Sequence, residues 1–273
     1  MGSMVLALSG GADSSFLLKV ASGVLPKKKL LAVTANSATY PQGELRLARA
    51  LAKELGVRHK IIRSAEIRNK NFYANPQNRC YFCKQELFRR LQRIAGAERL
   101  NFIADASNTD DKNDFRPWDK AKKAFRVRSP LQDAGFSKAD VRAASRQLGL
   151  MTWDKPQAAC LASRIPYGVE ITSRLLRRVE KAEDYLRGLG LRQVRLRHYP
   201  STDATAFSRE HLLRVPPAGL HNGLCRIETS PEEMPLLFKR RAAAARKLRQ
   251  LGYRYITLDL EGYRCGSLNE AGK

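Results

Sequence analysis

Short apolar runs alternate with amphipathic segments through the first part of the chain. Each run has the length of a buried strand, and each amphipathic segment repeats its apolar residues at helical spacing. Strands that alternate with helices predict an α/β fold with a mostly parallel sheet covered on both faces. The expected strands are residues 4–9, 30–36, 60–63 and 100–106, and the clearest helices are residues 14–24 and 42–55.

The alternation stops near residue 150, and a different pattern follows it. Two further helices and two further strands indicate a smaller α+β domain. We therefore expect a first domain over residues 1–167 and a second over residues 168–273. The elements expected in the second domain are helices at 173–189 and 231–251, the latter long and basic, and strands at 193–198 and 255–260.

The composition is that of an ordinary folded protein with a large excess of positive charge. The 273 residues include 50 Lys or Arg and 26 Asp or Glu, which gives a net charge of +24. Such a charge attracts nucleic acids, nucleotides or anionic membranes, although a basic surface that faces only solvent gives the same composition. No apolar stretch is long enough to span a membrane, and the first residues lack the pattern of a signal peptide.

A glycine-rich loop lies between the first expected strand and the first expected helix. Its sequence is Ser9-Gly10-Gly11-Ala12-Asp13-Ser14. The glycines let the backbone N–H groups approach an anion, the serine hydroxyls add donors, and the helix N-terminus favours negative charge. The loop lacks the Gly-Lys-Ser/Thr of a Walker A motif. We expect it to bind a phosphate or pyrophosphate; the alternative is an ordinary turn in which Asp13 caps the helix.

The chain contains five cysteines, and three of them suggest a site. Cys80 and Cys83 form a CxxC pair, and Cys160 lies in the stretch Ala-Cys-Leu-Ala-Ser-Arg. A zinc site would need a fourth ligand, a redox dithiol would need a thioredoxin-like setting, and three thiolates could hold an iron–sulfur cluster with one open iron. A buried structural pair is also possible. Cys225 and Cys265 have no ligand-like neighbours in the sequence. An odd number of cysteines fits reduced thiols in the cytoplasm.

Seven stretches of the chain together resemble the LarE family of PP-loop sulfur transferases, over nearly the whole length. The SGG-D-S core of the first stretch is common to all PP-loop enzymes, whereas NRCYFCK and CLASRIPYG are far more specific. The matching stretches are SGGADSSFLLKVA (9–21), AVTANS (32–37), NRCYFCKQELF (78–88), SNTDD (107–111), VRSPL (127–131), TWDKPQAACLASRIPYG (152–168) and LDLEGYRCGSLNE (258–270).

The resemblance implies a fold and a reaction. The fold is that of PP-loop ATPases, which are similar to adenine nucleotide alpha hydrolases, followed by a smaller domain. The reaction uses ATP and Mg²⁺: ATP adenylates a carboxylate of pyridinium-3,5-biscarboxylic acid mononucleotide, pyrophosphate leaves, and sulfur then displaces AMP. The product serves the nickel-pincer cofactor of lactate racemase. Asp13 would help to hold the magnesium pyrophosphate, together with Ser9, Gly10, Gly11 and Ser14.

The family contains two cysteine patterns, and this chain resembles the second. Members with a single cysteine at the position of Cys160 donate its sulfur and are left with dehydroalanine. Members with the additional CxxC hold a [4Fe-4S] cluster on three cysteines and replenish their sulfur from sulfide or another donor. The resemblance therefore implies that Cys80, Cys83 and Cys160 are cluster ligands, with Cys160 central to catalysis. It also implies a homo-oligomer.

The resemblance further assigns residues to the substrate. Glu183, Arg195, Arg197 and Arg264 are similar to positions that line the family's site beyond the nucleotide. Arginine forks suit a substrate phosphate, although arginines in so basic a chain also occur as solvated surface residues. Lys84, next to the CxxC, is expected to balance the charge of the acyl phosphate; the alternative is a surface lysine.

Two departures from the family pattern concern the substrate side and the nucleotide side. Extra residues rich in Pro and Gly intervene at 199–222, and we expect a peripheral surface loop there. They follow the presumed substrate arginines, so they bear on which substrate is used. Asp105-Ala106-Ser107 replaces the more usual Asp-Gly-Ser/Thr.

Two other PP-loop functions remain open on the sequence. A tRNA thiolase also joins a PP-loop to three cysteines, and the charge suits RNA, but no zinc ribbon or RNA-binding appendage is recognisable. An amide synthase would work without the cysteines.

Overall fold

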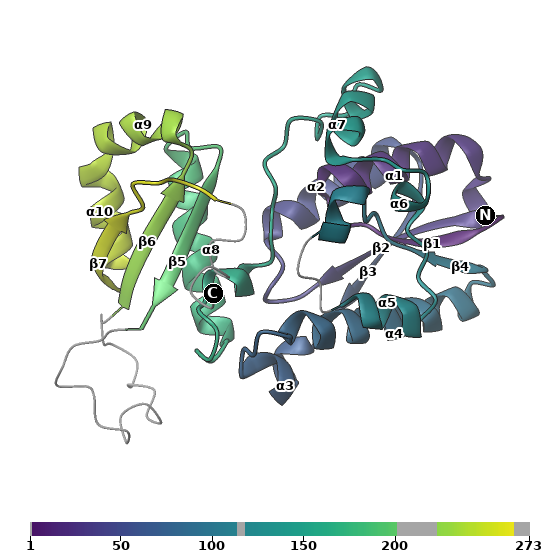
Figure 1. Ribbon diagram of the computed structural model, residues 1–273, viewed down its shortest axis with the longest axis horizontal. Coiled ribbons are helices and arrows are strands. Elements are labelled where there is room, and N and C mark those ends of the chain that lie inside the picture. Colours follow the sequence, from purple (N-terminus) through teal and green to yellow (C-terminus); the bar gives the residue numbers. More distant parts are fainter. Residues whose placement is uncertain (1, 114–117, 201–222, 265–273) are drawn as a thin grey trace. The chain divides into compact units, whose positions relative to one another are not determined.

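The computed structural model describes residues 2–113, 118–200 and 223–264, which form two compact units (Figure 1). The division falls between Cys160 and Leu161, whereas the sequence led us to expect it after residue 167. The short helix η4 (Leu161–Arg164) groups with the second unit because Ser163 and Arg164 are hydrogen bonded to side chains of that unit. The expected insertion at 199–222 lies almost wholly outside the described residues.

The first unit is built on a parallel four-stranded sheet. The strands have the order β3-β2-β1-β4, so the strand that precedes the glycine-rich loop is central. All three pairings are parallel, as the alternating pattern predicted. The bounds are β1 Met4–Ala7, β2 Leu30–Asn36, β3 Arg58–Arg63 and β4 Phe102–Ala104.

Helices cover both faces of this sheet (Figure 1). Met4, Leu6 and Leu8 pack into one core with α1 and α2, whereas Val5 packs into a second core with α4. Because neighbouring residues of β1 enter opposite cores, both must be apolar, and this explains the uninterrupted apolar run. The helices are α1 Ala12–Val24, α2 Gln42–Glu54, α3 Lys70–Tyr73, α4 Arg79–Ala97, α5 Asp119–Ala124, α6 Pro130–Asp133 and α7 Lys138–Gln147.

The second unit is a mixed sheet with helices packed on it. Its strands have the order β5-β6-β7; β5 and β6 are antiparallel, and β6 and β7 are parallel. The α+β class agrees with the expectation from the sequence. The elements are α8 Ser173–Gly188, β5 Val194–Tyr199, β6 Gly223–Thr229, α9 Met234–Lys239, α10 Arg241–Gln250 and β7 Tyr253–Leu258.

Two expectations for the second unit were wrong in detail. The basic helix expected over 231–251 is broken at Arg240, whose φ of −99° and ψ of 9° end α9 before α10 begins. Strand β6 was not expected at all. Its fully buried Glu228 pairs with Arg197 of β5, a contact between distant residues that the local sequence does not show. None of the helices in the described ranges combines the length and apolar character needed to cross a membrane.

Candidate functional site

The glycine-rich loop begins where the central strand β1 ends and leads directly into α1. Gly10 has a φ of 65°, in the left-handed region that favours glycine. A Cβ atom at Gly10 would lie 2.7 Å from the backbone oxygen of Glu44 in α2. Both the conformation and the close approach therefore require glycine at this position. Gly11 is the N-cap residue of α1, and no side chain caps the helix there.

Hydroxyl groups hold the loop in a closed turn. The hydroxyls of Ser9 and Ser14 lie 2.9 Å apart, and the Ser14 hydroxyl also accepts from the Ser9 backbone N–H at 3.1 Å. Tyr40 donates its hydroxyl to the Ser9 carbonyl oxygen at 2.7 Å. Hydrogen bonds within the protein thus fix the conformation of the loop. A loop of this kind at a helix N-terminus is the arrangement expected of a phosphate site.

Asp13, in the first turn of α1, has an unusual electrostatic setting. Burial and the nearby carboxylate of Asp111 raise its pKa above the ordinary value, and the Asn108 side chain and the cations of Lys138 and Arg142 partly offset this rise. Two carboxylates that repel each other beside a phosphate loop are suited to share a divalent cation. Mg²⁺ usually binds one or two carboxylates together with substrate phosphates. The alternative role of Asp13, a helix cap, is not what the structure shows, because α1 has no side-chain cap.

Lys155 fixes the glycine-rich loop from a distant part of the sequence. Its Nζ donates to the Gly10 carbonyl oxygen at 2.8 Å and forms an ion pair with Glu44 at 2.5 Å. Lys155 lies five positions before Cys160, in the stretch TWDKPQAAC. One lysine therefore connects the loop, α2 and the segment that carries Cys160.

The turn after β4 is held by a compact polar cluster. Asp105 accepts from the hydroxyls of Ser107 and Ser129, at 3.0 and 2.7 Å. The ammonium of Lys122 reaches the same two hydroxyls at 3.0 and 3.1 Å. Ala106, which replaces the more usual glycine, is accommodated within this turn. The cluster positions the residues that follow it, including Asp111.

Cys80 and Cys83 lie one turn apart near the start of α4, so their side chains share one face of the helix. Both thiols are half-buried, whereas Cys160 is exposed. Burial, followed by the neighbouring Cys160, raises the pKa of Cys80 to about 11, and the pKa of Cys83 is also raised, with burial the largest cause and Glu66 the next. Cys160 contributes to both increases, so the first unit brings the three thiols within electrostatic reach of one another.

Lys84 and Glu66 place opposite charges next to the CxxC. The cation of Lys84 partly offsets the rise in the pKa of both Cys80 and Cys83. Its ammonium lies 5.9 Å from the centre of the Phe88 ring. Glu66 is buried and accepts a hydrogen bond of 2.7 Å from the Thr39 hydroxyl. The predicted residue Lys84 therefore belongs to the surroundings of the thiols.

The three thiols do not form a ready metal site. Within the described ranges, no group of three or more His, Cys, Asp or Glu side chains is placed to hold a metal ion. The kind of donor nevertheless fits an iron–sulfur cluster, because three cysteine thiols lie near one another beside a cation. Cluster binding would require these thiols to converge further.

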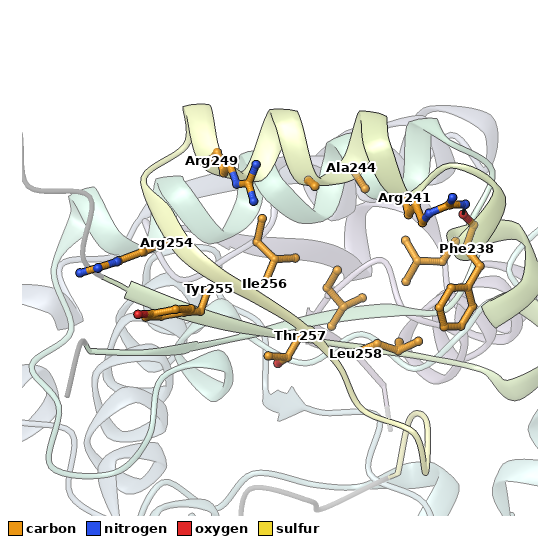
Figure 2. A pocket seen from close by; sticks show the side chains of 12 residues that line it. Phe238, Arg241, Ala244, Arg249, Arg254, Tyr255, Ile256, Thr257 and Leu258 are labelled. Carbon is orange, nitrogen blue, oxygen red and sulfur yellow. Dashed lines mark hydrogen bonds between the residues drawn. The ribbon is translucent and has the colours of Figure 1, made fainter. Parts of the chain in front are cut away.

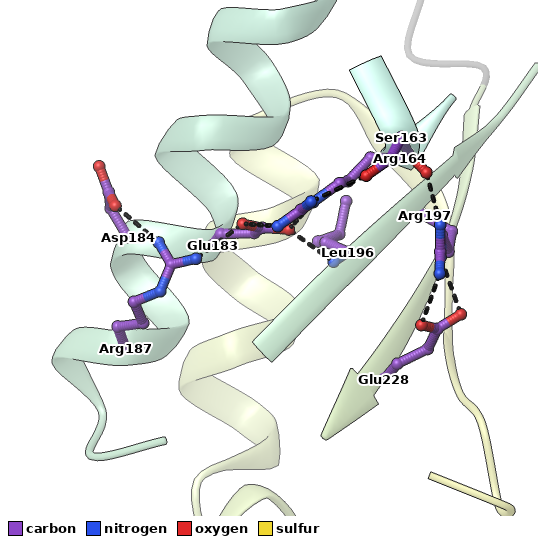
Figure 3. Close-up of polar contacts among 8 residues, drawn as sticks. All are labelled: Ser163, Arg164, Glu183, Asp184, Arg187, Leu196, Arg197 and Glu228. Carbon is purple, nitrogen blue, oxygen red and sulfur yellow. Dashed lines mark hydrogen bonds and ion pairs between the residues drawn. The ribbon is translucent and has the colours of Figure 1, made fainter. Parts of the chain in front are cut away.

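In the second unit, Glu183 is the centre of a buried ion-pair network (Figure 3). Its carboxylate accepts from Arg164 at 2.7 and 3.2 Å, from Arg187 at 2.8 Å and from the Leu196 backbone N–H at 3.0 Å. Burial opposes ionisation of Glu183, but Arg164 and the other donors outweigh burial and lower its pKa. Glu183 thus joins η4, α8 and β5.

Arg197 forms a second buried pair alongside the first. It donates to both oxygens of Glu228, at 2.9 and 3.1 Å, and a further N–H donates to the Ser163 carbonyl oxygen. Arg164 in turn donates to the Ser163 hydroxyl, so Ser163 and Arg164 connect the two pairs (Figure 3). The short helix η4, which follows Cys160, is thereby held in place within the second unit.

Of the other two arginines predicted for the substrate, Arg195 lies in β5 and Arg264 is the last residue of the described chain. Arg195 is 5% exposed, and its guanidinium lies 4.4 Å from the centre of the Tyr263 ring. Arg264 forms ion pairs with Glu261 at 2.5 Å and with Asp259 at 3.7 Å. Substrate binding by Glu183, Arg195, Arg197 and Arg264 stays a prediction; what the structure adds is that Glu183 and Arg197 hold other side chains in place.

Reasoning from the sequence missed several residues of the site. Asp111, Lys155 and Arg164 all lie in stretches that resemble the family, but no role was assigned to them. The spacing of the sequence does not show that Lys155 meets Gly10, or that Asp111 meets Asp13. The paired carboxylates could have been suspected from the two consecutive aspartates in SNTDD.

Comparison with known proteins agrees with this geometry. The NAD synthase family matches residues 1–94, the part of the chain that carries the strands β1, β2 and β3, the glycine-rich loop and the CxxC. With its parallel sheet and its loop between β1 and α1, the first unit has the fold of a PP-loop domain, and its first 94 residues are similar to NAD synthases.

Full-length relatives define the family more narrowly. The pyridinium-3,5-bisthiocarboxylic acid mononucleotide synthase of Lactiplantibacillus plantarum is 35% identical over 98% of this chain and 89% of its own length. The chain belongs to the LarE family, of which that synthase is a member. An uncharacterized Synechocystis protein, slr1717, is 41% identical over 97% of this chain and 91% of its own length. Another uncharacterized protein, MJ0830 from Methanocaldococcus jannaschii, is 24% identical over 96% of this chain and 90% of its own length.

Proposed function

We propose that this protein is an ATP-dependent sulfur transferase that converts carboxylates of pyridinium-3,5-biscarboxylic acid mononucleotide into thiocarboxylates. The observation that carries the proposal is the full-length similarity to a synthase of pyridinium-3,5-bisthiocarboxylic acid mononucleotide. The glycine-rich loop at the N-terminus of α1 and the neighbouring thiols support it, because the reaction needs both a nucleotide and a sulfur donor. The product would serve a nickel-pincer cofactor, and we expect a cytoplasmic homo-oligomer.

The first half-reaction is adenylation. A carboxylate oxygen of the substrate attacks the α-phosphorus of ATP, the bond to the bridging oxygen breaks, and pyrophosphate leaves. The N–H groups of the loop and the hydroxyls of Ser9 and Ser14 would bind the departing phosphates. Asp13 and Asp111 would hold Mg²⁺, which neutralises charge on the pyrophosphate. The cations of Lys138 and Arg142 already influence Asp13, so they lie on the same side of the site.

The second half-reaction is sulfur transfer. A carboxylate is a poor electrophile, whereas its acyl adenylate has AMP as a good leaving group. A sulfur nucleophile attacks the acyl carbon, and AMP departs with the electron pair of the broken C–O bond. Cys80, Cys83 and Cys160 would hold a [4Fe-4S] cluster, which when bound would supply the sulfur from sulfide or another donor. Lys84 would balance negative charge near these cysteines, and Arg195, Arg197 and Arg264 would orient the substrate through its phosphate.

The nucleotide products test this assignment directly. Incubation with ATP, Mg²⁺ and the pyridinium mononucleotide should yield AMP and pyrophosphate in equal amounts, as measured by ion-exchange chromatography. The absence of a Walker lysine from the loop motivates this expectation. ADP as the main product would contradict the proposal, and so would AMP formation that does not depend on the pyridinium substrate.

A further inference from the structure

A groove of about 480 Å³ runs along the outer edge of the second unit, between β7 and the helices α9 and α10 (Figure 2). Its walls are largely apolar. Phe238 and Tyr255 lie in the groove with 53% and 49% of their surface exposed. Large apolar side chains that line a concave surface commonly mark a binding site. The apolar lining includes Leu237, Phe238, Ala244, Ala245, Ile256 and Leu258.

The groove follows the open edge of a strand. β7 is the last strand in the order β5-β6-β7, and no strand of the described chain pairs with its outer side. The consecutive residues 254–258 all line the groove. Because successive side chains of a strand point to opposite faces, a groove lined by every residue must follow the strand edge. Such an edge offers backbone N–H and C=O groups to another extended segment.

Arginines border the same groove. Arg241 and Arg249 extend from α10 on the side of β7, as Figure 2 shows, and Arg254 lies at the start of the strand. Neither Arg241 nor Arg249 forms an ion pair with an acidic residue of the described chain; Arg241 donates only to the Phe238 carbonyl oxygen at 3.2 Å. The groove thus combines an apolar lining with two arginines that have no acidic partner among the described residues.

The spacing of these cations matches an extended chain. Arg241, Ala245 and Arg249 lie four residues apart on one face of α10, so the two arginines are separated by about 12 Å along the helix. Alternate residues of a strand share a face, and positions i and i+4 are about 13 Å apart. Two carboxylates at i and i+4 would therefore meet Arg249 and Arg241, and an apolar residue at i+2 would lie opposite Ala245.

We propose that this groove binds an extended acidic segment of a partner protein, which adds to β7 as a further strand. The segment would carry the pattern acidic-x-apolar-x-acidic. Binding through backbone hydrogen bonds with side-chain pockets is a common mode of peptide recognition. A second copy of this chain is a poorer match because its net charge of +24 would be repelled by the arginines of the groove. RNA is also a poorer match, since it cannot continue the backbone pairing of β7.

Synthetic peptides test this proposal on the full chain. The probe is a fluorescein-labelled nonapeptide with Glu at positions 2 and 6 and Val at position 4, and fluorescence anisotropy gives its affinity. Its controls are the same peptide with Gln at positions 2 and 6, and one with Pro at position 5, which cannot form the strand pairing. The acidic peptide should bind about tenfold or more tightly than the Gln peptide, as expected for two exposed ion pairs.

Charge-reversal variants locate the binding. Arg241→Glu/Arg249→Glu should lose about tenfold or more in affinity for the acidic peptide. It should gain affinity for the same peptide with Lys in place of Glu at positions 2 and 6. Arg240→Glu/Arg246→Glu is the matched control: it changes the net charge equally at exposed positions outside the groove, and it should retain most of the binding. Both variants should keep the AMP-forming activity, which lies elsewhere.

Three results would overturn the proposal. The first is that the acidic peptide fails to bind the wild-type chain or binds both double variants equally. The second is that oligouridylate, but not the peptide, binds in a manner lost on reversal of Arg241 and Arg249, which would assign the groove to RNA. The third is a concentration-dependent self-association that these reversals abolish without any peptide binding.

Discussion

At the residue scale, Asp13 is a side chain whose ionised form destabilises the fold but is suited to bind a cation. Its carboxylate is mostly buried and lies near that of Asp111, and both effects raise its pKa. An acid with a raised pKa destabilises the folded state once it is ionised, because the unfolded chain holds the charge more easily. A divalent cation removes this cost. The position is therefore better explained by ligand binding than by folding.

Asp13→Asn should eliminate most turnover without unfolding the protein. We expect a loss of AMP formation of about 100-fold or more, since a ligand that stabilises developing charge is removed. The melting temperature at pH 7 should be unchanged or higher, because one of two repelling carboxylates becomes neutral. Magnesium pyrophosphate should raise the melting temperature of the wild type but not of the variant. A variant that melts well below the wild type would show that Asp13 is structural.

A second prediction at the residue scale concerns Lys155. Lys155→Met keeps the length of the side chain but removes the contacts with Gly10 and Glu44, so the Michaelis constant for ATP should rise. The change should also cost about 1–3 kcal/mol of stability, because the half-buried Glu44 loses its partner. The double variant Lys155→Met/Glu44→Gln should recover much of the stability but not the ATP affinity. Recovery of both would mean that Lys155 only neutralises Glu44.

At the element scale, the sequence predicted the parts of the fold that depend on local pattern. The four parallel strands and the helices α1, α2 and α8 were found close to their expected bounds, because their apolar residues follow the spacing of buried strands or of amphipathic helices. Strand β6 and the break at Arg240 were missed. Glu228 in β6 is buried only because Arg197 of β5 pairs with it, and such a tertiary pairing leaves no local signal.

The residues of the candidate site could likewise be predicted only where they lie close together in the sequence. The glycine-rich loop and the CxxC were evident because their residues are consecutive or closely spaced. The roles of Asp111 and Lys155 depend on contacts between distant segments, which spacing cannot show. Glu183 was expected to face the substrate, and its complete burial among arginines could not be anticipated from an amphipathic helix.

The network around Glu183 should make stability depend on pH. Because the folded state lowers the pKa of Glu183 below its usual 4.5, the ionised carboxylate stabilises the fold at neutral pH. This contribution is present above about pH 4.5 and should be lost as the pH falls through the lower folded pKa. Glu183→Gln should therefore destabilise the protein by about 3–5 kcal/mol at pH 7, because Arg164 is left buried without its counter-ion.

Urea denaturation at several pH values measures this effect. The difference in unfolding free energy between wild type and Glu183→Gln should shrink as the pH falls below 4.5. Glu54→Gln, at an exposed position at the end of α2, serves as the control and should leave stability within about 0.5 kcal/mol. A difference that stays constant with pH would contradict the assigned role of the Glu183 charge.

At the scale of the whole molecule, the chain combines a PP-loop domain that is similar to NAD synthases with three neighbouring thiols. Two routes for the sulfur make different predictions for the CxxC. If the cysteines hold a cluster, anaerobically purified protein should contain iron, and Cys80→Ser/Cys83→Ser should lose both iron and repeated turnover. Cys225→Ser, at a buried strand position, should keep both. A cysteine double variant that performs one transfer and then stops would indicate sacrifice of Cys160 instead.

The most direct test of the central claim is the identity of the product. Mass spectrometry of pyridinium-3,5-biscarboxylic acid mononucleotide after incubation with the protein, ATP, Mg²⁺ and sulfide should show oxygen replaced by sulfur at one carboxylate and then at both. The same mixture without ATP, or with Asp13→Asn, should return the substrate unchanged. Formation of AMP with an amidated or unaltered acceptor, or transfer of sulfur to tRNA instead, would contradict the proposed function.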